Sequence, residues 1–182
     1  MKKSKIFRIT MISLFFAGLL IAVPGFSQNA KEKELIKDSR EAQAAFLKSD
    51  SLMQSLFANS YAYVVFPNIG KGGIGIGGAA GNGIVYQNGN PVGSAKMKQV
   101  SIGFQFGGQT YREVIFFENE DALNRFKENN FEFAAQASAV AVTKGASANV
   151  KYRDGVMVFT QEKKGLMYEA SVGGQKFNYS PF

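Results

Sequence analysis

The sequence of 182 residues contains no cysteine, no histidine and no tryptophan. Without cysteine, neither a disulfide nor a lipoprotein anchor can form, and the lack of histidine as well removes thiolate and imidazole ligands for a metal. Nucleophilic systems of the Ser-His-Asp and Cys-His kinds are excluded for the same reason. We therefore predict a protein that is not an enzyme, with no catalytic residue, no metal site and no cofactor.

The beginning of the chain has the three parts of a secretory signal peptide. Basic residues come first, an apolar run covers residues 9–23, and Pro24 is followed by small residues at Gly25 and Ser27. A single membrane anchor is the alternative, but the run is shorter than the ~20 residues that a spanning helix needs. We predict a signal peptide over residues 1–27, one exported domain over residues 28–182, and a periplasmic or secreted location, which includes peripheral attachment to the outer membrane.

Acidic residues are missing from a long central stretch. The whole chain carries +7, and residues 28–182 hold 17 basic and 14 acidic residues, a balance too even to indicate nucleic acid as a partner. From Ser51 through Arg112 there is no Asp or Glu, and the charged residues are Lys71, Lys96, Lys98 and Arg112. If these four fold together, they form a basic face that attracts anionic headgroups or phosphates. The alternative is a solvated sheet edge on which lysines prevent aggregation.

Hydrophobic patterns predict helices first and strands afterwards. Residues 28–59 are typical of two amphipathic helices, the second with an N-cap at Asp50 or Ser51. A short helix capped by Asn119 is expected at residues 118–127, with strands on both sides of it. The predicted strands cover residues 61–66, 70–86, 100–105, 111–117, 131–143, 156–161 and 166–172, with turns at 87–90 and 162–165. The fold class is α+β, with N-terminal helices packed on a strongly curved, mostly antiparallel or barrel-like sheet and one inserted short helix.

The glycine-rich centre contains a G-x-G-x-x-G pattern at Gly73, Gly75 and Gly78. A dinucleotide site needs this pattern between a strand and a helix, with an acid about 20 residues further on. Here Ile74 and Ile76 alternate with glycine and an Asn-Gly turn signal follows at Asn88, so the segment is predicted to be strand.

Acidic residues suggest one enzymatic alternative, a hydrolase that uses carboxylates. Glu118, Glu120 and Asp121 could hold Ca²⁺ or act as acid and base, but their place at a helix start favours capping. The hydrolase hypothesis requires Glu113 or Glu118 to lie buried beside a second acid in a cleft.

The last six residues suggest another alternative, a small outer-membrane β-barrel. Aromatic residues at Phe177, Tyr179 and Phe182 resemble a closing barrel strand. The leading helices, the inserted helix and Pro181 argue against it.

Several segments in order resemble the SYLF domain family. The first group comprises Phe66-Pro67, Lys71-Gly72-Gly73, Gly77-Gly78 and Gly81-x-Gly83. The second comprises Ser101-x-Gly103-x-Gln105-x-Gly107-Gly108-Gln109, Val114 to Phe117, Asn119 to Leu123, and Lys164-Gly165-Leu166. The resemblance covers the chain from about Leu35 to Tyr179.

This resemblance implies a lipid-binding module, because eukaryotic members of the family bind phosphoinositides and, in fungi, actin filaments. Actin is not expected as a partner of an exported protein. In the first helix Lys31, Lys33, Lys37 and Arg40 are interleaved with acids, so this helix should bind anionic membranes weakly. We expect an exported module that contacts phospholipid or another anionic lipid through Lys71, Lys96, Lys98 and Arg112. The alternative is a structural or protein-interaction module of the cell envelope, with a protein partner.

Overall fold

The computed structural model describes residues 25–74, 76–102, 108–129, 131–133, 139–164 and 172–182. Two helices come first, α1 (Gly25–Ser49) and α2 (Met53–Asn59). Four long strands follow, namely β1 (Ala62–Ile74), β2 (Ile76–Gln87), β3 (Asn90–Ile102) and β4 (Gln109–Phe117). The rest of the chain forms α3 (Glu120–Lys127), β5 (Val140–Ala141), the 3₁₀ turn η1 (Ala146–Asn149), β6 (Val156–Lys164) and β7 (Gln175–Pro181). The predicted signal peptide lies almost wholly outside the described residues, and α1 begins at Gly25.

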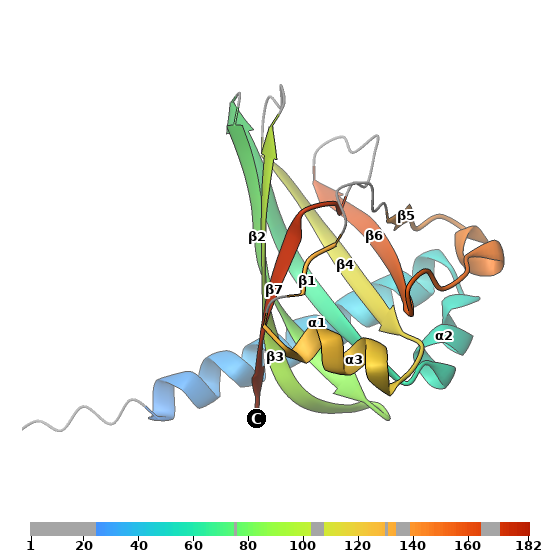
Figure 1. Cartoon of the computed structure of the whole chain (residues 1–182), viewed down its shortest axis with the longest axis horizontal. Coiled ribbons are helices and arrows are strands. Elements are labelled where there is room, and N and C mark those ends of the chain that lie inside the picture. Colours follow the sequence, from blue (N-terminus) through green and yellow to red (C-terminus); the bar gives the residue numbers. More distant parts are fainter. Residues whose placement is uncertain (1–24, 75, 103–107, 130, 134–138, 165–171) are drawn as a thin grey trace, which may run out of the picture.

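Within the described residues, the strands form one open sheet in the order β5-β6-β4-β1-β2-β3-β7. Every neighbouring pair is antiparallel except β5 and β6, which are parallel. The sheet curves around α3, and α1 runs along the opposite side (Figure 1). This arrangement confirms the α+β prediction in its curved-sheet form, and the sheet is not closed. In the part of the chain that the structure describes, no helix is long and apolar enough to cross a membrane.

The glycine-rich centre is strand backbone, as the sequence pattern predicts. β1 and β2 form a hairpin in which Gly72 pairs with Gly78, and no helix follows the G-x-G-x-x-G pattern. Asn88 and Gly89 have φ angles of 52° and 74°, which is the left-handed backbone that a two-residue hairpin turn requires. A Cβ at Gly83 would lie 2.7 Å from Phe66 Cδ1 and from Val65 O. Close approach of neighbouring strands therefore explains this glycine.

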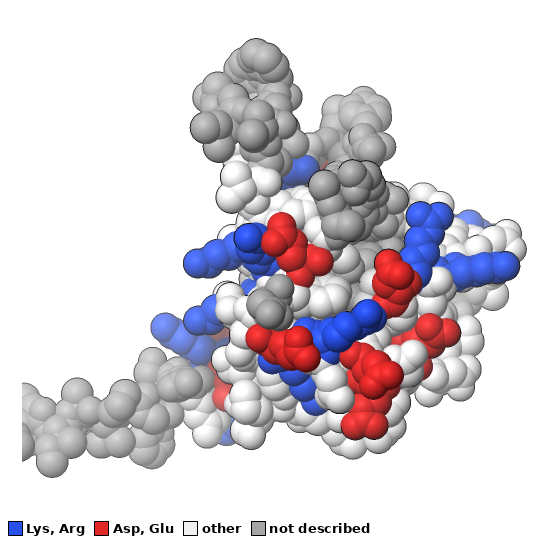
Figure 2. Space-filling view, in the orientation of Figure 1, with Lys and Arg blue, Asp and Glu red and all other residues white. Residues whose placement is uncertain are grey.

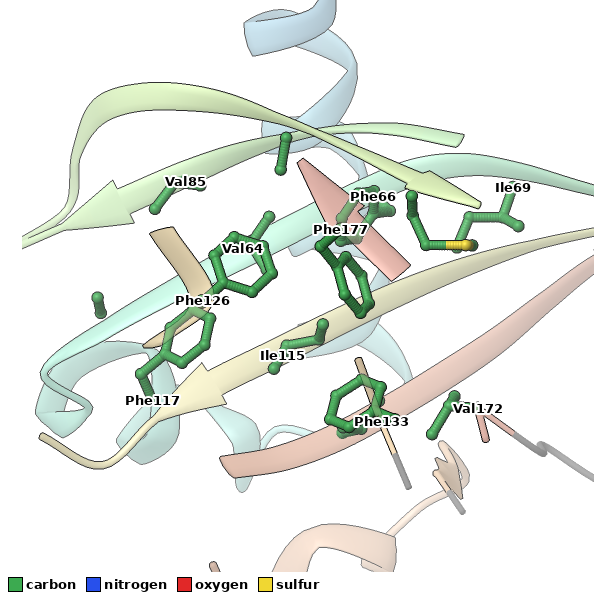
Figure 3. Packing of buried hydrophobic residues seen from close by; sticks show 14 of the residues in the cluster. Val64, Phe66, Ile69, Val85, Ile115, Phe117, Phe126, Phe133, Val172 and Phe177 are labelled. Carbon is green, nitrogen blue, oxygen red and sulfur yellow. The ribbon is translucent and has the colours of Figure 1, made fainter. Parts of the chain in front are cut away.

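Alternation along the strands gives the sheet two apolar faces. On β1, Val64 belongs to one cluster of buried residues and Val65 to the other. We call the face under α3 the inner face and the face under α1 and α2 the outer face. A register shift at Pro67, between Phe66 and Ile69, keeps both of these residues on the inner face. The inner cluster brings side chains from β1, β4, α3 and β7 together inside the curve (Figure 3).

The corner between α1 and α2 is held by a buried carboxylate. The second helix has Leu52 at its N-cap, so the predicted cap at Asp50 or Ser51 is wrong. Asp50 accepts hydrogen bonds from Leu52 N (3.1 Å), and from Ser147 N (2.8 Å) and Ser147 Oγ (2.7 Å). Burial acts to raise the pKa of Asp50, but these hydrogen bonds outweigh it and hold the pKa below its usual value.

Two other local predictions need correction. Residues 162–164 are not a turn, because β6 continues to Lys164 and pairs with β4, Glu162 lying opposite Tyr111. The strand expected at residues 131–143 is reduced to a bridge at Glu132 and the two residues of β5. Residues 134–138 and most of the strand predicted at 166–172 lie outside the described residues. Residues 103–105 of the strand expected at 100–105 also lie outside the described residues.

Candidate functional site

The four basic residues of the acid-free stretch do not share one face. Lys96 and Lys98 are exposed on the outer face of β3, because their neighbours Ala95 and Met97 are buried in the inner cluster. Lys71 lies on the inner face, where it pairs with Ala79 of that cluster. The structure therefore brings Lys96 and Lys98 together and separates Lys71 from them.

Arg112 is part of a structural hydrogen-bond chain. It is half-buried on the outer face of β4, and β1 and β2 separate it from β3. Its Nη1 donates to Gln161 Oε1 (3.0 Å), and Gln161 Nε2 donates to Ser49 Oγ (2.6 Å) at the end of α1. This guanidinium joins β4 to β6 and α1.

The outer face of β3 and β7 carries a group of three lysines. Lys98 is the direct cross-strand partner of Lys176, and Lys96 lies two residues along β3 on the same face. We call Lys96, Lys98 and Lys176 the lysine row. Lys176 Nζ lies 3.2 Å from Glu132 Oε2, and both side chains remain largely in solvent. Lys176 is not among the residues predicted from the sequence, because the pairing of β3 with β7 joins positions far apart in the chain.

Lys96 lies in a mixed electrostatic environment. It lines a shallow groove of about 430 Å³ between α1 and β3, together with Lys31, Glu32, Glu34 and Asp38. Three acids beside two lysines weaken the local attraction for an anion. Within the lysine row, Lys98 and Lys176 are therefore better placed to contact an anionic group.

A polar group crosses the interior of the curved sheet. Glu113 of β4 is fully buried, and its Oε2 accepts a hydrogen bond from Gln175 Nε2 of β7 (2.9 Å). Burial raises the pKa of Glu113 to about 7, and the hydrogen bond from Gln175 offsets only part of this. Burial also raises the pKa of the Tyr111 phenol, and the nearby Glu113 charge adds to that effect.

The carboxylates do not form the pair that the hydrolase hypothesis requires. The described neighbours of Glu113 are an amide and a phenol, and Glu118 is exposed. Asn119 Oδ1 accepts a hydrogen bond from Ala122 N (3.0 Å), and Glu120 and Asp121 lie in the first turn of α3, so the capping interpretation is confirmed. Among the described residues, no group of three or more acids could hold a metal ion.

A cavity of about 1020 Å³ opens where the sheet fails to close. One wall comes from residues 131–133, which bond to the edge of β7 through Phe133 N to Gln175 O and Phe177 N to Phe131 O, both 3.1 Å. The other wall comes from β5, β6 and the segment from Asn149 to Asp154. Acidic and basic side chains alternate over this side of the molecule (Figure 2).

This cavity is not among the sites predicted from the sequence. Its lining comes from five separate segments, and the nearest local signal is the Lys151-Tyr152-Arg153 triplet, in which one aromatic lies between two cations. The acid-free stretch indicates charges elsewhere, whereas the cavity depends on how two sheet edges meet.

Comparison with known proteins supports the motifs of the second half of the chain. Residues 98–180 match the family model Ysc84, described as "Las17-binding protein actin regulator". A curated relative, "Beta cell expansion factor A" of Aeromonas veronii, is 28% identical over 82 residues, which are 45% of this chain and 31% of the relative. The matched region contains Lys98, Arg112, Lys176 and every described residue that lines the large cavity, whereas Lys71 and Lys96 precede it. Residues 98–180 are therefore similar to the Ysc84 family, which is the SYLF family that the sequence motifs resemble.

Proposed function

We propose that this protein is a non-enzymatic, exported module that binds anionic lipid headgroups at a membrane surface. The observation that carries the proposal is the lysine row on the outer face of β3 and β7. The similarity of residues 98–180 to the SYLF family supports the lipid-binding class, because the family includes lipid-binding modules.

The geometry of the lysine row suits a contact with a charged surface. Neighbouring strands lie about 4.8 Å apart, so Lys98 and Lys176 are close enough to approach one phosphate or two adjacent ones. The exposed Val100 continues the same face beyond Lys98, with 74% of its surface in solvent. A cationic pair beside an exposed apolar side chain matches the boundary between headgroups and acyl chains.

The first helix contributes little to this attraction. Its basic residues alternate with acids, and Lys37 Nζ lies 3.7 Å from Glu41 Oε1 in an exposed i, i+4 pair. Opposite charges at this spacing stabilise the helix weakly and cancel at longer range. We assign the membrane contact to the sheet, and we leave Lys71 and Arg112 out of it.

Vesicle co-sedimentation of the purified protein tests the proposal. We expect binding to phosphatidylglycerol vesicles at low salt, weaker binding at high salt, and none to pure phosphatidylcholine. A variant with Lys98→Ala and Lys176→Ala should lose most of this binding, with a loss of about thirtyfold in affinity for two contacts at roughly 1 kcal/mol each. A variant with Lys33→Ala and Lys48→Ala carries the same net charge and should bind nearly as the wild type.

Two outcomes would overturn the assignment. Equal weakening of both double variants would show that net charge alone governs binding, with no site at the lysine row. Failure of the wild type to bind any anionic vesicle would exclude headgroup binding. A stoichiometric partner recovered from envelope extract would then favour the protein-interaction alternative.

A further inference from the structure

The large cavity lies at the seam between the two edges of the open sheet. At one edge, residues 131–133 extend β7 through the backbone hydrogen bonds of Phe131 and Phe133. At the other edge, β5 extends β6, with Val142 N donating to Thr160 O (2.8 Å). The space of about 1020 Å³ between them is at the upper end of the range of small-molecule pockets, roughly 300–1000 Å³. A ligand of extended shape would touch both edges.

The walls of this cavity are mostly apolar. Phe131, Phe133 and Val172 come from the β7 side and continue into the inner cluster. Val140, Val150 and Met157 come from the β6 side and pack against the outer cluster. Figure 3 shows Phe133 beside Val172 at this end of the inner cluster, and the ring of Phe133 lies 5.5 Å from that of Phe177. A hydrocarbon chain placed here would bury its surface against both clusters, at about 25 cal/mol per Å² of apolar area.

The rim of the cavity supplies positive charge. Arg125, Lys151 and Arg153 line it, and the acids there are Glu132 and Asp154. Glu132 is already engaged by Lys176 at 3.2 Å, which leaves three cations against one other acid. Arg125 Nη2 donates to Asp154 O (2.5 Å), so its guanidinium is held at the rim while further N–H groups of the same side chain stay available.

We propose that this cavity binds an anionic single-chain amphiphile, a fatty acid or a lysophospholipid. The hydrocarbon chain occupies the space between the two sheet edges, and the carboxylate or phosphate contacts Lys151 and Arg153. The site is distinct from the lysine row and does not rest on membrane binding, because it takes one molecule out of water and needs no bilayer.

Fluorescence titration with cis-parinaric acid, without vesicles, tests the proposal on the whole purified protein. We expect saturable binding, with palmitate and lysophosphatidylglycerol both displacing the probe and hexadecanol displacing it weakly because it lacks the charge. Displacement by palmitate alone would identify the carboxylate class, and displacement by lysophosphatidylglycerol alone would identify the phosphate class. Absence of saturable probe binding by the wild type would overturn the proposal.

Two sets of variants locate the site. Val140→Trp and Val150→Trp each enlarge a half-buried side chain that lines the cavity, and should weaken probe binding at least tenfold. Val100→Trp, on the exposed outer face, is the matched control and should leave probe binding unchanged. The double variant Lys151→Gln and Arg153→Gln changes two exposed residues and should lower the affinity for palmitate about tenfold, with hardly any change in the affinity for hexadecanol. This variant still tests the site if a tryptophan variant does not fold.

The two proposals can fail separately. Loss of probe binding in the cavity variants with unchanged vesicle binding supports the cavity as an independent site. Weaker vesicle binding in a Lys98→Ala variant, which leaves the ion pair of Lys176 with Glu132 intact, together with unchanged probe binding, supports the lysine row. Unchanged probe affinity in every cavity variant would mean that the fatty acid binds elsewhere, and the cavity would carry no ligand site.

Discussion

The two faces of the sheet differ in how they are covered and in how their buried polar groups are satisfied. On the outer face, α1 and α2 cover the strands, and the buried Ser39 of α1 has a polar partner, with its Oγ 2.5 Å from Tyr86 Oη. On the inner face, a fully buried glutamate crosses the interior and its Oε1 accepts no hydrogen bond within the described residues. An unsatisfied buried oxygen costs roughly 1–3 kcal/mol. This difference indicates that the outer face is optimised for stability. The inner face retains an unsatisfied buried oxygen, and the seam beside it retains an unfilled cavity.

The largest expected loss of stability tests whether the packing on the outer face stabilises the fold. Phe46 of α1 is fully buried in the outer cluster, so Phe46→Ala should lower the free energy of unfolding by about 3–5 kcal/mol. Leu47→Ala, at the half-buried next position, is the control and should cost distinctly less. Urea denaturation measures both. A loss below about 1 kcal/mol for Phe46→Ala would mean that α1 adds little to the fold.

The next largest effect concerns Glu113, whose replacement should raise the free energy of unfolding at high pH instead of lowering it. Its pKa of about 7 in the folded protein lies above the unfolded value of about 4.3, so the folded state keeps a proton that the unfolded state loses. The contribution of Glu113 to stability therefore falls as pH rises from about 4 to 7 and is flat above that. Glu113→Gln should remove this dependence and raise the free energy of unfolding at pH 8 by up to about 3 kcal/mol.

Chemical denaturation at a series of pH values checks this prediction. Glu118→Gln changes an exposed carboxylate next to the end of β4 and serves as the control, with no comparable gain at high pH. Parallel pH profiles for wild type and Glu113→Gln would show that Glu113 stays ionised in the fold, and the contrast between the two faces would be weaker than proposed.

A smaller effect on stability distinguishes a glycine that close packing on the inner face requires from a glycine that it does not require. Gly83→Ala places a Cβ 2.7 Å from a ring carbon of Phe66 and from a backbone oxygen, so the strands must shift, at a cost of about 2 kcal/mol. Gly72→Ala has no atom within 4 Å of the added Cβ and should be nearly neutral or slightly stabilising. Thermal unfolding of the two variants gives the difference directly. Equal losses would indicate that chain flexibility, rather than close packing, explains the glycines of this segment.

Local sequence patterns predict most of the elements of this fold. Local patterns identify β4 and much of β1 and β2, although the single strand predicted at residues 70–86 is divided between β1 and β2 by a hairpin at Ile74 and Ile76. The Asn88-Gly89 pair identifies the hairpin between β2 and β3, and Asn119 identifies the start of α3. The patterns do not show the register shift between Phe66 and Ile69 of β1, which places Lys71 on the inner face, opposite to the face that carries Lys96 and Lys98. Likewise, the partner of Lys98 and the seam beside β6 depend on long-range strand order, which charge spacing does not encode.

The smallest effect concerns the helix that covers the inner face. Asn119 accepts a hydrogen bond from Ala122 N at 3.0 Å and so caps α3, whose Phe126 packs in the inner cluster. Asn119→Ala should cost about 1 kcal/mol, because a backbone N–H at the helix start loses its partner. Asn124→Ala, on the exposed side of the same helix, should be neutral or slightly stabilising, since alanine is the better helix former. If instead Asn119→Ala proves neutral in urea denaturation, α3 is held by the packing of Phe126 and its neighbours alone. The inner face would then depend on apolar packing as fully as the outer face does.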